Sequence, residues 1–185
     1  GMEIRAQAFA FTSNDEINNM TFYNYELINR GTQTLYDTYF GYFTDGALGD
    51  PLDDYVGCDV NRGLAYYYNG DNYDGDNAGW LGYGDNPPAV GVDFFEGPFQ
   101  DNDGIANDYG IGLGEALNGI GYGDTIVDNE RFGMRQFLYY SNTTLGANPN
   151  QTDPTTAADY YSYLQGFWKD GTSFYYGGTG HISDP

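Results

Sequence analysis

Aspartate side chains gathered in two glycine-bearing loops are the residues of this sequence best suited to chemistry. The first loop carries Asp45, Asp50, Asp53, Asp54 and Asp59, and the second carries Asp71, Asp74, Asp76 and Asp85. Ca²⁺ takes about 6 to 8 oxygen ligands, and short side chains at Asp-x-Asp spacing in a turn can converge on one ion. The loops therefore predict calcium binding. The alternative is that these acids cap turns and keep the chain soluble.

The second loop does not follow the EF-hand pattern. In a frame that begins at Asp74, Asp76 and Gly79 occupy the third and sixth places, but Ala78 stands at the fifth and Asp85 replaces the final glutamate. A calcium site here would be of another kind.

Aromatic residues lie in and beside the second loop, among them Tyr66, Tyr67, Tyr68, Tyr73, Trp80 and Tyr83. Most are expected to serve core packing, but rings beside carboxylates can also stack on sugars. Tyr73 and Trp80 are the candidate ligand-contacting residues of this second interpretation.

Catalytic patterns are weaker than the calcium pattern. The sequence lacks the GxSxG, HExxH and P-loop motifs, and its only histidine, His181, lies near the end of the chain. A glycosidase could use two carboxylates, with Asp93 and Glu96 or Glu115 and Glu130 as candidate pairs, but nothing selects between them. We name no catalytic residue and favour a non-enzymatic role, while leaving an enzymatic one open.

The charge of the chain restricts its partners. Its 27 acidic and 6 basic residues give a net charge of −21, so nucleic acid and anionic membrane surfaces would be repelled. No stretch approaches the roughly 20 apolar residues of a membrane span. We therefore expect no nucleic-acid partner and no membrane insertion.

Tyrosine, phenylalanine and glycine are abundant, and aspartate outnumbers glutamate, as is typical of strands joined by tight turns. Strands are expected at 3–11, 20–30, 34–43, 54–60, 63–69, 89–97 and 131–142, with 20–30 and 34–43 forming a hairpin across the turn at 30–33. One short helix is expected near 155–168, with Thr155 or Thr156 as N-cap and Asp159 in its first turn.

These elements predict an all-β protein built as a β-sandwich, of which a jelly roll is one form, with long acidic loops and one short helix near its C-terminal end. Residues 1–185 are expected to form a single domain. Gly1-Met2 at the start is typical of a domain excised from a longer chain.

Several runs of the sequence resemble one protein family. They include DDYVGCDVNRGLAYYYNGD, NPPAVGVDFFEGP and RFGMRQFLYYSN. Nearly the whole chain resembles an internal domain of large secreted or surface proteins of Bacteroidota exported by the type IX route. In those proteins the first acidic loop reads like DADLG or DPDLG; here Asp45 to Gly49 keeps the first acid, the leucine and the glycine but not the second acid.

The resemblance implies a secreted or cell-surface location. Together with the acidic loops it predicts a non-enzymatic, calcium-stabilised module with an adhesive or structural role. Its expected partners are other domains of the same polypeptide, an extracellular glycan or a surface protein. The alternative is a domain that binds carbohydrate or hydrolyses polysaccharide.

Overall fold

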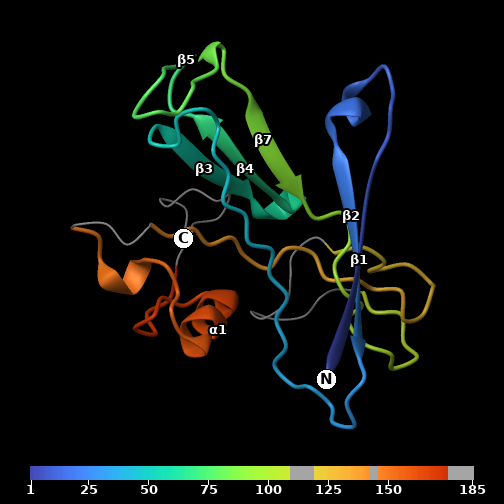
Figure 1. Ribbon diagram of the computed structural model, residues 1–185. Helices are drawn as coiled ribbons and strands as arrows, with labels where there is room; N and C mark the ends of the chain where they lie inside the picture. Colours follow the sequence, from blue (N-terminus) through green and yellow to red (C-terminus); the bar gives the residue numbers. More distant parts are fainter. Residues whose placement is uncertain (109–118, 142–145, 175–185) are drawn as a thin grey trace. The chain divides into compact units, whose positions relative to one another are not determined.

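The computed structural model (Figure 1) describes residues 1–108, 119–141 and 146–174, and divides the chain into two compact units, 1–39 and 40–185. The strands are β1 (Met2–Ala10), β2 (Thr21–Asn29), β3 (Asp54–Asp59), β4 (Leu64–Asn69), β5 (Tyr73–Asp74), β6 (Gly84–Asp85) and β7 (Ala89–Asp93). The helices are the 3-10 turns η1 (Glu16–Asn19), η2 (Val60–Arg62) and η3 (Pro149–Gln151), and the α-helix α1 (Ala157–Gln165). The predicted all-β class is confirmed, because the described residues form antiparallel sheets with one α-helix. That the whole chain is a single domain stays a prediction.

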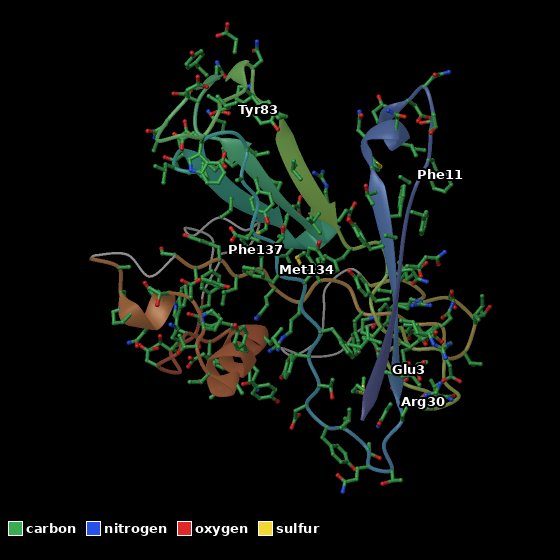
Figure 2. All side chains as sticks on the ribbon, in the orientation of Figure 1. Glu3, Phe11, Arg30, Tyr83, Met134 and Phe137 are labelled. Atoms are coloured by element: carbon green, nitrogen blue, oxygen red, sulfur yellow. The ribbon has the colours of Figure 1, made fainter. Side chains whose placement is uncertain are left out.

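The first unit is an antiparallel hairpin of β1 and β2 with two unlike faces. On one face Ile4 stands opposite Leu27. On the other, Glu3 accepts hydrogen bonds from Arg5 and Arg30 at 2.7 Å each, and these two partners, Arg30 first, lower the pKa of the Glu3 carboxyl (Figure 2). Arg5 also stands directly opposite Glu26, to which it donates a hydrogen bond at 2.9 Å, so both faces carry favourable cross-strand contacts.

The hairpin corrects one expectation from the sequence. The predicted partner of β2 was 34–43, but β2 pairs with β1 and 34–43 forms no strand. The reason is that β1 offers β2 favourable cross-strand pairs over nine residue pairs, among them Ile4 with Leu27, Arg5 with Glu26 and the stacked rings of Phe9 and Phe22.

The second unit is built on a three-stranded antiparallel sheet in the order β3-β4-β7. Strands β3 and β4 are joined by η2, which Asp59 caps at its N-terminus and which ends at Gly63 with φ of 68°. Only glycine adopts that conformation readily, and the turn separates β3 from β4, in agreement with the two strands predicted at 54–60 and 63–69. On one face of the sheet Cys58 and Ala65 stand opposite each other, and both are buried.

The loop that precedes β3 covers this buried face. A Cβ added at Gly46 would lie 3.1 Å from the ring of Tyr67, and Leu48 is buried and donates its backbone N–H to Asp54. Burial raises the pKa of the Cys58 thiol to about 11. The thiol therefore stays protonated at neutral pH.

Two further predictions can be compared with the structure: the helix near 155–168 and the strand at 131–142. Thr156 caps α1 and Asp159 lies in its first turn, as predicted, and the Thr156 hydroxyl and the Asp159 carboxylate also form a reciprocal capping box. The helix ends at Gln165, so Trp168 lies beyond it, and Tyr163 is its buried residue. Residues 131–141, the described part of the predicted strand 131–142, form no strand: Arg131 and Ser141 make isolated bridges, and the residues between them are held by irregular contacts such as the hydrogen bond from Gln136 to the Tyr163 carbonyl.

Candidate functional site

Four of the nine predicted aspartates come together where the covered face of the sheet ends. Asp53 and Asp54 introduce β3, Asp50 lies in the loop before it, and Asp74 lies on β5. The negative charges of Asp50 and Asp74 act on both Asp53 and Asp54. We call Asp50, Asp53, Asp54 and Asp74 the acidic cluster.

Asp74 holds the cluster together from the inside. Its side chain is 1% exposed, and its carboxylate accepts the backbone N–H of Asp50 at 3.1 Å and that of Tyr83 at 2.8 Å. A Cβ at Gly49 would lie 1.8 Å from the Asp74 carboxylate, so only glycine admits this approach. Asp74 therefore ties the first acidic loop to the β5–β6 segment, where Figure 2 labels Tyr83.

Asp50 is also buried and fully engaged. One carboxylate oxygen accepts the backbone N–H of Leu52 at 3.1 Å, and the other accepts the side-chain amide of Asn77 at 2.7 Å. Asn77 is thus a neighbour of the cluster that the sequence did not single out.

Asp53 and Asp54 each keep one buried carboxylate oxygen, Oδ1, without a hydrogen-bond partner. Desolvation is the main cause that raises the pKa of both carboxyls, and the charges of Asp50 and Asp74 raise them further. Like charges held together out of water are unfavourable unless a cation compensates them. These two oxygens are therefore the ones that most need a partner.

Asn69 supplies a fifth oxygen. It stands directly opposite Asp54 in the β3–β4 pair, so the two side chains share a face with Cβ atoms about 4.5 to 5.5 Å apart. Asn69 is 7% exposed; its amide nitrogen donates to the carbonyl of Asp71, while its Oδ1 has no partner. Asp54 and Asn69 thus bring two unpartnered oxygens, one from a carboxylate and one from an amide, to the same face of the sheet, and both are hard ligands of the kind that Ca²⁺ takes.

The remaining five predicted ligands have other roles. Asp59 caps η2, Asp71 accepts the backbone N–H of Tyr73 at 2.8 Å, and Asp76 accepts that of Gly82 at 3.0 Å. Asp45 and Asp85 are exposed. The described contacts therefore bring together four of the nine candidates, with Asn69 beside them, and the set of metal ligands stays a prediction.

A second group of acids, Asp101, Asp103 and Asp128, was not singled out from the sequence, although its Asp-x-Asp-Gly spacing could have shown it. One ligand atom from each lies within 4.8 Å of the others. Asp103 and Asp128 accept the backbone N–H groups of Ile105 and Gly104, at 2.9 Å each. Turn formation accounts for these contacts, so we assign no site there.

The candidate sugar-contacting and catalytic residues are not brought together by the described contacts. Tyr73 and Trp80 are both more than half exposed, and neither ring has an aromatic partner in the described part of the chain. Glu96 pairs with Arg131 at 3.7 Å, and Glu130 is buried and accepts the backbone N–H of Asn107. Glu115 and His181 lie outside the described residues.

Neither the scan against protein-family models nor the searches of curated proteins and solved structures found a match. Among the described residues, no helix has the length and apolar character that crossing a membrane requires. The function is therefore argued from the site.

Proposed function

We propose that this chain is a non-enzymatic, calcium-stabilised module of a secreted or cell-surface bacterial protein, with an adhesive or structural role. The observation that carries the calcium proposal is the acidic cluster, in which Asp53 and Asp54 keep buried oxygens without partners beside the unpartnered Oδ1 of Asn69. The surface location rests on the resemblance to exported proteins of Bacteroidota. The β-sandwich is part of the same proposal, with β3-β4-β7 as one of its sheets.

The donor set favours calcium over a softer metal. Carboxylate and amide oxygens are hard ligands, which suit Ca²⁺, whereas Zn²⁺ and copper prefer imidazole or thiolate. Cys58 lies on the same face of β3 as Asp54, but its thiol has a pKa of about 11 and offers no thiolate near neutral pH. A flexible loop can also provide the irregular coordination that Ca²⁺ accepts and Mg²⁺ does not.

A bound ion would hold separate segments of the second unit together. The cluster draws on the loop before β3, the start of β3 itself and β5. Neutralising the charges of Asp53 and Asp54 at this junction favours the folded chain, because the unfolded chain does not hold them there. A stabilised, acidic module of this kind suits an extracellular setting, where its partners would be neighbouring domains of the polypeptide, a glycan or a surface protein.

Thermal unfolding at matched ionic strength tests the calcium proposal. We expect millimolar Ca²⁺ to raise the melting temperature above that in EDTA, and Mg²⁺ to raise it less. Superimposable transitions in the three buffers would contradict it. The location is tested separately by antibody labelling of intact cells of the source bacterium, where labelling only after permeabilisation would contradict a surface location.

A further inference from the structure

Three tyrosines lie on the face of the β3-β4-β7 sheet opposite the one that carries Asp54, Cys58 and Ala65. Tyr55 on β3 stands opposite Tyr68 on β4, and Tyr66 follows two residues before Tyr68 on the same face. Tyr55 is 58% exposed and Tyr68 is 41% exposed. We call Tyr55, Tyr66 and Tyr68 the tyrosine face.

Glycines make room for two of these rings. A Cβ at Gly57 would lie 2.5 Å from Cζ of Tyr66, and a Cβ at Gly70 would lie 2.4 Å from Cε2 of Tyr55. The rings of Tyr66 and Tyr55 therefore lie against the backbone of Gly57 and Gly70, respectively. Glycine inside a strand costs about 0.5 to 1 kcal/mol relative to alanine and often marks a place of close approach.

The rings form one continuous surface. The centroids of Tyr55 and Tyr68 are 5.9 Å apart with an angle of 27° between the rings, and those of Tyr66 and Tyr68 are 5.9 Å apart with an angle of 39°. Neither pair is edge to face. Tyr55 and Tyr68 are stacked and Tyr66 is tilted against Tyr68, so the three rings form one aromatic row and not an enclosing cage.

Carboxylates lie at one end of this row of rings. Asp59 on β3 and Asp93 on β7 both stand opposite Leu64, on the same face as the rings. Asp59 is engaged with Arg62, whereas Asp93 is exposed. A ligand lying on the rings would meet hydrogen-bond acceptors at this end.

We propose that the tyrosine face binds a neutral saccharide, with the C–H faces of its sugar rings against Tyr55 and Tyr68 and its hydroxyl groups donating to Asp93. The net charge of −21 opposes an anionic ligand and also a second copy of the chain, but a neutral polyol is not repelled. A cationic partner fits less well, since aromatic recognition of cations typically uses a cage of rings. This inference does not depend on calcium binding by the acidic cluster.

Native affinity electrophoresis in calcium-containing buffer tests the proposal. The probes are three neutral polysaccharides (mixed-linkage β-glucan, xyloglucan and galactomannan), with polygalacturonate as the anionic control and a lysine-rich peptide, measured by fluorescence anisotropy, as the cationic one. We expect at least one neutral polysaccharide to retard the protein. Tyr68→Ala should weaken that interaction about tenfold, as loss of a central aromatic contact does. Tyr160→Ala, at an exposed tyrosine on α1, is the matched control and should leave it unchanged.

Tyr55→Ala is a second variant in case Tyr68→Ala does not fold. It lies on the edge strand β3, and more than half of the Tyr55 side chain is already exposed to solvent, so this change should disturb folding little. It should also weaken retardation, whereas Tyr55→Phe should preserve it. Melting temperatures are measured in parallel to confirm that each variant is folded. Failure of all three neutral polysaccharides to retard the protein overturns the proposal, as does retardation equal to that of the parent in folded Tyr55→Ala and Tyr68→Ala. Tyrosine-dependent binding of the lysine-rich peptide alone overturns it in favour of a cationic partner.

Discussion

Asp54→Asn should change the sign of its effect on stability according to whether calcium is present. The amide oxygen of asparagine can still accept the Leu48 backbone N–H, which donates to Asp54 at 2.8 Å. The change removes one negative charge from beside Asp50 and Asp74, the charges that help raise the pKa of the Asp54 carboxyl. In EDTA the variant should therefore be as stable as the parent or more stable, by up to about 1 kcal/mol, the size of a partly exposed charge interaction.

In calcium the same substitution removes a ligand. At 100 times the dissociation constant a bound ion stabilises the parent by about 2.7 kcal/mol, which corresponds to a rise in melting temperature of roughly 5 to 11 °C for a chain of this length. If the variant binds about tenfold more weakly, the same calcium concentration stabilises it by about 1.4 kcal/mol, roughly half as much. The variant should then melt below the parent.

Differential scanning calorimetry in EDTA and in calcium gives both comparisons. Asp85→Asn is the matched control, since it removes the same charge from an exposed residue outside the acidic cluster. It should leave the rise in melting temperature caused by calcium unchanged. An equal calcium-induced rise in Asp54→Asn and the parent, or marked destabilisation of Asp54→Asn in EDTA, would refute the reasoning.

Three further predictions concern groups outside the acidic cluster. The backbone N–H groups of Thr155 and Thr156, which donate to Asp159, lower the pKa of its carboxyl, so the stability that it contributes is complete above the ordinary pKa of about 3.9 and is lost as pH falls through the lower folded value. In urea unfolding, Asp159→Asn should therefore be less stable than the parent at pH 7 and equally stable in strong acid. A stability difference that does not change with pH would count against this. The buried Tyr163 hydroxyl donates to the Thr152 carbonyl at 2.6 Å, so Tyr163→Phe should cost about 1 to 3 kcal/mol in chemical denaturation, whereas Tyr160→Phe, at an exposed ring, should cost almost nothing; equal costs would contradict it. The Cys58 thiol, with its pKa raised to about 11 by burial, should react slowly with a thiol reagent at pH 8 in the native protein and quickly in urea; a native rate equal to the unfolded rate would disprove its protection.

The sequence predicted those elements whose signals are local. Strands β3 and β4 are aromatic and β-branched runs interrupted by Gly63, and the Thr156–Asp159 capping box lies within four residues. Each signal acts over a few residues, so no distant partner had to be chosen. The partner of β2 was predicted wrongly because β1 and 34–43 are both plausible by composition, and the choice depends on cross-strand contacts such as that of Arg5 with Glu26, which lie 21 residues apart in the sequence.

The aspartate-rich loops could be singled out from the sequence, but the residues that gather in the acidic cluster could not, and calcium binding itself stays a prediction. Aspartate-rich loops predicted oxygen ligands, and Asp50, Asp53, Asp54 and Asp74 are among those residues. Sequence spacing could not separate them from Asp71 or Asp85, because the cluster depends on how the first loop folds over the sheet and meets β5. Asn69 was missed for the same reason: only the strand register places it opposite Asp54.

Calcium titration followed by amide NMR is the most direct test of the central claim that the acidic cluster binds calcium. The backbone N–H groups of Leu48, Asp50 and Tyr83 donate to the carboxylates of Asp54 and Asp74, so their resonances report on the cluster itself. If the acidic cluster binds calcium, these three resonances should shift saturably in the parent and much less in Asp54→Asn. Unchanged resonances at Leu48, Asp50 and Tyr83 at millimolar calcium would contradict it, whatever other parts of the chain respond.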